Sequence, residues 1–206
     1  MPSVIAVLVA RNGGEYLPRT IAALRAQTRP PDDILVVDAS SSDDSGSILS
    51  AAFPGQLTTT PGRVSFGAAV SAAMQLGAPP AVEDQWLWLL GHDNAPDFGA
   101  LAALLGAVEV APSVAIAGPK LMRWDDASVI AGFGETMTPF GRSIRLAVDE
   151  LDQAQHDVQS DQLGVAASGM LIRRQVYSTL GGLDRGLPSV DAGLDLSVRP
   201  GSLVTA

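Results

Sequence analysis

The chain has 206 residues, of which 47% are hydrophobic and 17% charged, so it can bury a core and is too apolar to be intrinsically disordered. Lys and Arg (13) are outnumbered by Asp and Glu (22), which gives a net charge of −9. No basic run occurs, which argues against a nucleic-acid partner, and the lack of cysteine excludes disulfides, thiolate catalysis and cysteine-bound metals.

The N-terminal segment is apolar but lacks the basic region and the cleavage site of a signal peptide. No apolar run reaches the roughly 18 residues that a membrane-spanning helix needs. We therefore expect no transmembrane segment in this chain and a cytoplasmic protein, with the inner face of the membrane as the alternative place of action.

A β-branched apolar run at residues 4–10 predicts a first strand that is buried on both faces of a parallel sheet. A polar turn follows, and residues 15–27 then place Leu and Ile at helical spacing. The next segments repeat this alternation with short connections, which predicts a doubly wound α/β sheet. The further expected strands are 33–38, 56–60, 86–90 and 113–118, and the further expected helices are 48–53, 65–76 and 97–110.

The chain changes character after residue 119. Residues 120–145 are rich in Gly, Thr and aromatic residues, which predicts a β-hairpin or an irregular layer across the sheet edge. The acidic, Gln-rich residues 149–162 are typical of a mobile loop or a poorly packed helix. Residues 167–172 are expected to form another strand, and residues 173–180 a short helix that ends at a pair of glycines.

Polar residues follow three of the predicted strands. Arg11 and Asn12 follow the first strand, Asp38 ends the second, and His92 and Asp93 follow the strand at 86–90. The ligand crevice of an open α/β sheet lies outside the carboxyl ends of its strands, so we expect these side chains to converge there. A carboxylate in that crevice can hold a hard divalent cation against a phosphate.

In this order the segments resemble the family 2 inverting glycosyltransferases, which have the GT-A fold. The opening reads LVARNGGEYLPRTIAALRAQTRPPDDILVVDASSSDDS and is similar to the family's first two strands with their Asn-containing turn and Asp-ended loop. RVSFGAAVSAAM resembles the glycine-containing start of the next helix, and WLLGHDNAP takes the place of the aspartate triplet. SGMLIRRQVYSTLGGLD is similar to the segment that shapes the acceptor side.

The resemblance implies a Rossmann-like, mostly parallel sheet flanked by helices. Residues 1–118 would bind the nucleotide sugar, and residues 119–206 would form the acceptor side of the same domain. The implied reaction transfers a sugar from a nucleotide-diphosphate sugar to an acceptor hydroxyl with inversion. The setting would be cell-wall or surface polysaccharide synthesis, with a glycan or a lipid-linked molecule as acceptor.

The resemblance also assigns site residues. Asp93 matches the last aspartate of the triplet, which coordinates the Mg²⁺ or Mn²⁺ ion that bridges the donor diphosphate. Gly91 and His92 replace the first two aspartates. The positions that correspond to nucleotide-sugar contacts are Ala10, Arg11, Asn12, Glu15, Asp38, Gly67, His92 and Asp93.

The catalytic base is the weakest match. The family has an acidic pair, then an apolar residue, another acid and a short run to Arg. Asp195 and Arg199 match that pattern, but Ala192 and Gly193 stand where the acidic pair belongs. Asp191 is the nearest replacement, so Asp191 and Asp195 are the candidate catalytic residues. The family continues with a further strand and helix, which predicts that residues 1–206 form an incomplete catalytic domain.

Other interpretations remain open. Asp38 and the following serines are also typical of a helix cap, His92 of a structural histidine and Asp191 of a helix start. His156 and Asp157 form a second potential metal pair, for which a solvated loop is the favoured interpretation. A catalytically impaired nucleotide-sugar-binding or scaffold domain is the alternative function. A dinucleotide-dependent oxidoreductase would need a Gly-x-Gly-x-x-Gly turn, and the turn RNGGEY lacks it.

Overall fold

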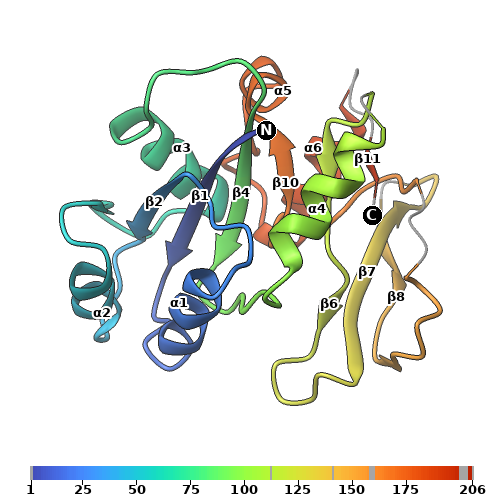
Figure 1. Cartoon of the computed structure of the whole chain (residues 1–206), viewed down its shortest axis with the longest axis horizontal. Helices are drawn as coiled ribbons and strands as arrows, with labels where there is room; N and C mark the ends of the chain where they lie inside the picture. Colours follow the sequence, from blue (N-terminus) through green and yellow to red (C-terminus); the bar gives the residue numbers. More distant parts are fainter. Residues whose placement is uncertain (1, 112, 141, 158–160, 200–203, 206) are drawn as a thin grey trace.

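A computed structural model describes residues 2–111, 113–140, 142–157, 161–199 and 204–205 (Figure 1). The main sheet contains β1 (Ser3–Ala10), β2 (Asp33–Asp38), β3 (Leu57–Thr59), β4 (Gln85–Gly91), β5 (Ile116–Ala117), β10 (Leu171–Arg173) and β11 (Val204–Thr205). The helices are α1 (Leu17–Arg25), α2 (Ser45–Ala52), α3 (Phe66–Leu76), α4 (Ala100–Glu109), α5 (Arg174–Thr179) and α6 (Ser189–Val198). A second layer contains β6 (Leu121–Met122), β7 (Val129–Met137), β8 (Ser143–Ala147) and β9 (Glu150–Leu151).

The main sheet has the strand order β11-β5-β10-β4-β1-β2-β3 and is mostly parallel. β1 lies between β2 and β4 and is parallel to both, with Ala10 opposite Asp38 and Val9 opposite Gly91. Only β10 runs against its neighbours β4 and β5 within the described residues. The carboxyl ends of β1, β2 and β4 therefore share one edge, as the predicted doubly wound sheet requires.

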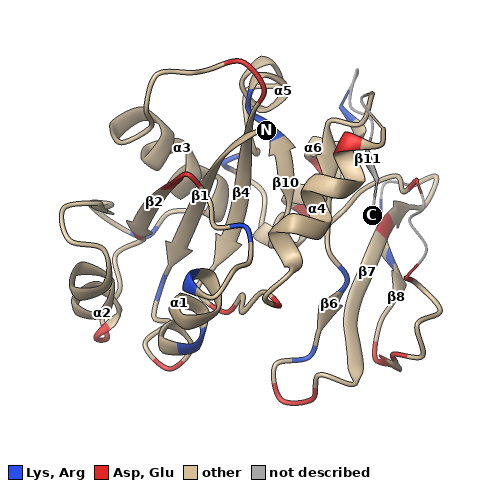
Figure 2. Ribbon diagram, viewed as in Figure 1, with Lys and Arg blue, Asp and Glu red and all other residues tan. Residues whose placement is uncertain are grey.

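Helices cover both faces of this sheet. On one face α1, α2 and α4 pack against alternate residues of the central strands, among them Trp86 and Trp88. On the other face α3, α5 and α6 pack against the intervening residues, among them Leu87 and Leu89 (Figure 1). Because side chains alternate along a strand, burial on both faces requires the uninterrupted apolar runs of β1 and β4. Neither strand carries a charged residue, and most charges lie on loops and helix surfaces (Figure 2).

The second layer is an antiparallel sheet beside the carboxyl edge of the main sheet. β7 pairs with β6, β8 and β9, so the hairpin predicted after residue 119 is confirmed. Gly134 has φ +57°, a left-handed conformation that interrupts the alternation of β7. As a result residues 132–135 are all buried: Phe133 packs in the small hairpin core, and Glu135 faces the crevice described below.

The α/β fold class and its mostly parallel sheet flanked by helices are confirmed. Two local predictions differ from the structure. Residues 149–157 contain β9 and a hydrogen-bonded turn where a poorly packed helix was one expectation. The strand expected at 167–172 begins at Leu171, because Gly169 has φ +86°, a left-handed conformation outside the extended range of a strand. Residues 169–170 still exchange two hydrogen bonds with Leu89, from the Gly169 amide to the Leu89 carbonyl (2.7 Å) and from the Leu89 amide to the Met170 carbonyl (2.8 Å).

Candidate active site

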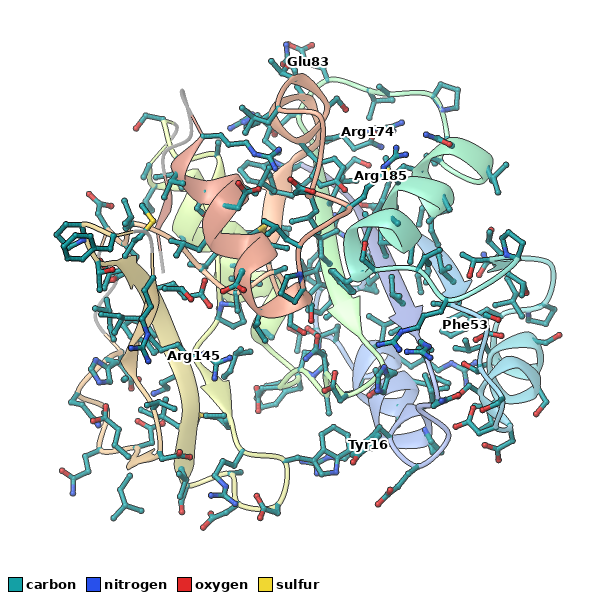
Figure 3. The ribbon with its side chains drawn as sticks, turned by 180° about the vertical axis from the view of Figure 1, so that it is seen from behind. Tyr16, Phe53, Glu83, Arg145, Arg174 and Arg185 are labelled. Carbon is teal, nitrogen blue, oxygen red and sulfur yellow. The ribbon has the colours of Figure 1, made fainter. Side chains whose placement is uncertain are left out.

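A cavity of about 730 Å³ opens between the carboxyl edge of the main sheet and the second layer. Its walls come from the ends of β1 and β4 on one side and from β6, β7 and β8 on the other. Tyr16 stands on the α1 side and Arg145 on the β7–β8 hairpin (Figure 3), and both line the cavity. The cavity therefore joins the predicted donor-binding residues 1–118 to the hairpin that follows them.

The turns after β1 and β2 are held together by hydrogen bonds. Asn12 has φ +49°, a left-handed conformation that asparagine tolerates better than most residues. Its Oδ1 accepts from the Ser42 amide (2.8 Å), and its own amide donates to Ser41 Oγ (3.0 Å). Asp38 is 7% exposed and accepts from the Ser41 amide through Oδ1 (3.1 Å). Asn12 and Asp38 thus fix the backbone of the crevice rim.

These contacts show that Asp38 does not cap helix α2, which was the alternative interpretation of this residue. Helix α2 begins at Ser45, and its N-cap residue is Asp44, whose side chain makes no capping bond. Asp43 accepts from the Ser45 amide instead (3.1 Å). The carboxylate of Asp38 bonds within its own turn, so it is not a helix cap, and its neighbour Ala39 lines the cavity.

His92 is packed against the first turn. A Cβ atom on Gly13 would lie 2.5 Å from the His92 ring, so this close approach requires glycine. The ring also lies against Tyr16, with 5.9 Å between ring centroids, and the His92 carbonyl accepts from Thr20 Oγ1 (2.6 Å). These contacts agree with the structural interpretation of His92, although its side chain also lines the cavity.

Asp93 is exposed at the cavity wall. The turn that presents it is held by Asn94, whose Oδ1 accepts from the Gly91 amide (2.7 Å) and from Ser168 Oγ (2.6 Å). The described part of the chain contains no group of three or more His, Cys, Asp or Glu side chains that could hold a metal ion. A single carboxylate does fit Mg²⁺ or Mn²⁺ that is held mainly by substrate phosphates and water.

Arg11 lines the same cavity and lacks a protein counter-ion among the described residues. Its Nε is buried and has no hydrogen-bond partner there. A buried N–H group without a partner is costly, and a guanidinium matches the oxygens of a phosphate. Arg11 and Asp93 together therefore suit a diphosphate with a bound cation.

Five of the eight predicted nucleotide-sugar contacts lie outside the cavity lining: Asn12 and Asp38 in the rim turns, and Ala10, Glu15 and Gly67. Ala10 is fully buried and pairs with Asp38, and Glu15 is exposed to solvent. Gly67 is required for packing, because a Cβ atom there would lie 2.8 Å from Leu183 Cβ. Phe66, the residue before Gly67, does line the cavity. Nucleotide contacts by all eight residues stay predictions.

Helix α6 carries both candidate catalytic aspartates, and neither lines the cavity, although Ser189 and Val190 of the same helix do. Asp191 is half-buried and accepts from Ser143 Oγ of β8 (2.9 Å). Asp195 forms an ion pair with Arg199 one helical turn later. Their catalytic role stays a prediction.

The same helix explains the missing acidic pair. Ala192 and Gly193 are buried against residues 165–167. A Cβ atom on Gly193 would lie 2.2 Å from the Val165 carbonyl oxygen and 2.4 Å from the Ala167 nitrogen. Real Cβ atoms do not approach backbone this closely, so the second position of the pair has no room for a carboxylate in this structure.

Two further features of the cavity were missed in the sequence. Glu135 on β7 is 4% exposed, lines the cavity, and has a buried Oε2 without a hydrogen-bond partner among the described residues. Burial raises the pKa of this carboxyl, and the charge of Asp191 adds to the effect. The available signal was a lone acid in the apolar run VIAGFGETM.

The second missed feature is Trp124, which connects the second layer to α1. The guanidinium of Arg19 lies 4.3 Å from the centroid of the Trp124 ring and donates to the Trp124 carbonyl through Nη1 (3.0 Å). Tyr16 meets the same ring edge-on, with centroids 5.2 Å apart. Tyr16 and Trp124 thus form an aromatic wall of the cavity.

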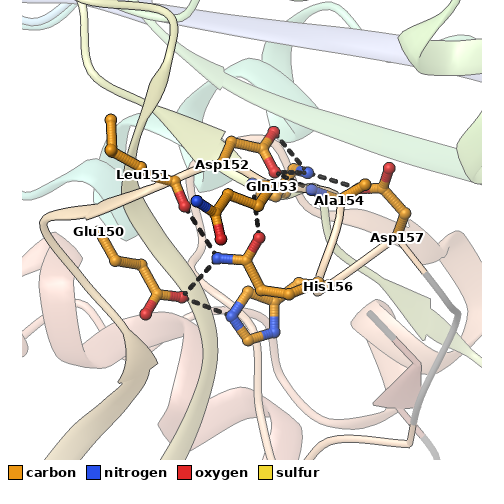
Figure 4. Close-up of polar contacts among 9 residues, drawn as sticks. Glu150, Leu151, Asp152, Gln153, Ala154, His156 and Asp157 are labelled. Carbon is orange, nitrogen blue, oxygen red and sulfur yellow. Dashed lines mark hydrogen bonds and ion pairs between the residues drawn. The ribbon is translucent and has the colours of Figure 1, made fainter.

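His156 and Asp157, the second potential metal pair, each contact a different partner. His156 Nε2 lies 2.5 Å from Glu150 Oε1 (Figure 4). The His156 ring also stacks on Phe133, with 4.9 Å between ring centroids. Asp157 instead pairs with Lys120 (2.5 Å), which also bonds Asp152. These residues brace the second layer, and neither His156 nor Asp157 lines the cavity.

A doubly wound sheet with a crevice at its carboxyl edge, lined by an unpaired Arg and a carboxylate, is an architecture typical of nucleotide-binding α/β domains. Residues 5–180 match the family described as Glycosyl transferase family 2. The chain belongs to this family, and the resemblance seen in its motifs is confirmed.

Relatives and solved structures agree with this assignment. The chain is 31% identical to galactofuranosyltransferase GlfT1 of Mycobacterium tuberculosis over 137 residues, which cover 63% of this chain and 43% of GlfT1. S. aureus TarS 1-349 has a similar fold, with a TM-score of 0.65 and 11% identity over 98% of this chain and 57% of that one. The mannosyltransferase PcManGT from Pyrobaculum calidifontis gives a TM-score of 0.64 and 14% identity, covering 98% of this chain and 56% of that one.

The structural neighbours show that the sheet, its helices and the second layer form a GT-A fold. The chain spans about half the length of these relatives. Among the helices of the described residues, none is long and apolar enough to cross a membrane.

Proposed function

We propose that this chain is the donor-binding core of a glycosyltransferase that moves a sugar from a nucleotide-diphosphate sugar to an acceptor hydroxyl with inversion. The observation that carries the proposal is the crevice itself, where Arg11 and Asp93 line one cavity at the carboxyl edge of the sheet. Both side chains are free of protein counter-ions among the described residues, so both are available to a ligand.

In this proposal each wall binds a different part of the substrates. Arg11 contacts the donor phosphates, while Asn12 and Asp38 hold the rim beside the nucleoside. Asp93 would hold a divalent cation together with the diphosphate, and that cation would stabilise the departing nucleoside diphosphate as a Lewis acid. Arg145 and the β7–β8 hairpin face the cavity from the acceptor side. In this proposal residues 119–206 would supply the acceptor half of the domain.

Relatives support the choice of donor class and setting. TarS has been solved with UDP and with UDP-GlcNAc, and PcManGT with GDP-Man and Mn²⁺. By analogy with these proteins, we propose that this chain uses a nucleotide-sugar donor and a Mg²⁺ or Mn²⁺ cofactor. The likeness to a galactofuranosyltransferase supports a role in cell-wall or surface polysaccharide synthesis, on a glycan or lipid-linked acceptor at the cytoplasmic side.

A catalytically impaired nucleotide-sugar-binding or scaffold domain is the second candidate, and the buried Gly193 favours it because that position excludes a carboxylate. Donor turnover separates the two functions. Measurable hydrolysis or transfer that Asp93→Ala abolishes would exclude the impaired domain.

The first experiment is a thermal-shift screen of UDP-GlcNAc, UDP-glucose, UDP-galactofuranose and GDP-mannose, each with and without Mn²⁺. A ligand present at about 100 times its dissociation constant should add roughly 2.7 kcal/mol to the free energy of unfolding. We expect at least one donor to raise the Tm in the presence of Mn²⁺. If no nucleotide raises it in either condition, the proposed function loses its support.

A further inference from the structure

Glu135 is a buried carboxylate in the acceptor wall that no known role explains. It is 4% exposed, yet it lines the cavity that also contains Asp93. Its Oε2 lacks a hydrogen-bond partner among the described residues. A buried polar atom without a partner is costly and needs an explanation, and a perturbed carboxyl in a cleft is a candidate for a functional group.

The backbone places Glu135 beneath α6. Its amide donates to the Gly164 carbonyl (2.7 Å), and its carbonyl accepts from the Gly164 amide (3.0 Å). Gly164 in turn packs on α6, because a Cβ atom there would lie 2.6 Å from Leu194 Cδ1. Glu135 therefore approaches from the hairpin the same helix that lacks the family's acidic pair at Ala192 and Gly193.

Other carboxylates are poorer candidates for proton transfer to or from an acceptor. Asp125 also lines the cavity, but Arg123 neutralises it through two hydrogen bonds of 3.0 Å. Asp191 bonds to Ser143, and Asp195 pairs with Arg199. Asp93 lies on the donor side, at the end of β4. Glu135 is the one carboxylate that is buried in the acceptor wall among the described residues.

We propose that Glu135 is the general base that accepts the proton of the acceptor hydroxyl, in place of the absent acidic pair. This inference rests on the proposed transferase function. The acceptor oxygen forms a bond to the anomeric carbon, and its proton passes to Glu135. The bond between that carbon and the diphosphate oxygen breaks, and the electron pair leaves with the nucleoside diphosphate. In the absence of an acceptor, water takes the same place and the donor is hydrolysed.

Charged neighbours adjust this base. Arg145 stands directly opposite Glu135 in the β7–β8 ladder, and its positive charge favours the ionised carboxylate. Asp191 approaches from α6, and its negative charge makes Glu135 more basic. A carboxylate whose pKa is raised toward neutral pH accepts a proton more readily.

The test compares Glu135→Gln with wild type and with Glu150→Gln. Glu150 is a matched control because it lies in the same layer but not in the cavity lining. Turnover is followed as release of labelled sugar from the donor that the screen selects, and donor affinity is measured by calorimetry. We expect Glu135→Gln to lower kcat by about a hundredfold or more, the usual contribution of a general base, with UDP affinity within twofold of wild type. Glu150→Gln should retain full turnover.

A second variant distinguishes a base from a merely structural residue. Glu135→Asp keeps a carboxylate and should recover part of the turnover, with its acidic limb displaced along the pH axis. If the Gln variant does not fold, this displacement decides the question. Turnover of Glu135→Gln within threefold of wild type, or an acidic limb that does not move in Glu135→Asp, would overturn the inference and leave the transferase function intact. A wild-type protein that binds donor without turning it over excludes a base here, and one that binds no donor refutes the proposed function as well.

Discussion

The two walls of the crevice are built in different ways. The donor wall consists of short turns after β1, β2 and β4, tied to one another by backbone and side-chain bonds such as those of Asn12 and Asn94. The acceptor wall consists of the β7–β8 hairpin and α6, where a left-handed Gly134 and a tightly packed Gly193 direct the chain. The donor wall keeps Asp93 of the family's aspartate triplet, whereas the acceptor wall lacks the family's acidic pair. In the proposed mechanism, the binding of the leaving group would thus be separated structurally from the activation of the acceptor.

Asp93→Ala should have the largest effect, because it tests the donor wall at its ligand-facing carboxylate. We expect a loss of turnover of about a hundredfold to a thousandfold, the range for removing one stabiliser of charge in a transition state. The Mn²⁺-dependent part of the thermal shift should vanish as well. Retained turnover in this variant would show that the donor wall works without a cation at Asp93.

Gly193→Asp tests whether the acceptor wall can accommodate an acid of the kind that the family motif contains. The new Cβ would meet the Val165 carbonyl at 2.2 Å, so α6 or the segment below it must shift. Overpacking of this kind costs roughly 1–3 kcal/mol, and a buried charge adds to that cost. Denaturant unfolding should show the loss, and turnover should not rise. An unchanged stability with higher turnover would mean that the motif position is open after all.

Arg11→Ala probes the donor wall at its phosphate contact. Removing a charge-assisted hydrogen bond of about 1.5–3 kcal/mol should weaken UDP binding roughly tenfold to a hundredfold. Arg11→Lys keeps the charge but loses the planar fork, so it should fall between Ala and wild type. If calorimetry gives the same UDP affinity for wild type and both variants, Arg11 does not contribute to nucleotide binding.

Glu135→Gln should have the smallest effect on stability among these substitutions. In contrast to Gly193→Asp in the same wall, we expect it to stabilise the protein. Burial raises the pKa of Glu135 in the folded protein, so the folded state loses stability as the pH rises through that pKa. The Gln variant lacks this loss and should unfold at a higher Tm than wild type at pH 7. The difference should shrink at a pH below the ordinary carboxyl range. A lower Tm for the Gln variant at pH 7 would contradict a charged, poorly compensated Glu135.

The sequence predicted the strands of the donor wall and their shared edge well because these signals are local. Apolar runs specify β1, β2 and β4, and the polar residue after each strand, such as Asp93, is directed by strand geometry to the shared edge. The acceptor wall depends on contacts between distant segments. Glu135 enters the cavity because Gly134 breaks the alternation of β7 and because residue 164 pairs with it from another segment. No pattern within β7 alone could reveal either cause.

Side-chain partners were also beyond prediction. Asp191 was chosen as a candidate base from its place near the motif, and its role stays a prediction, but the sequence could not show that its carboxylate accepts from Ser143 of β8. Gly67 was expected beside the nucleotide, and the structure uses its lack of a side chain for packing on Leu183. At both positions the sequence shows the residue type but not which distant residue contacts it.

The central claim is that the donor wall binds a nucleoside diphosphate with a divalent cation at Asp93. Calorimetric titration of UDP into wild type and Asp93→Asn, each with and without Mn²⁺, tests it most directly. The account predicts that Mn²⁺ tightens UDP binding to wild type by about tenfold or more, or roughly 1.4 kcal/mol, and has little effect on the Asn variant. Equal UDP affinity in all four titrations, or no binding in any, would contradict it.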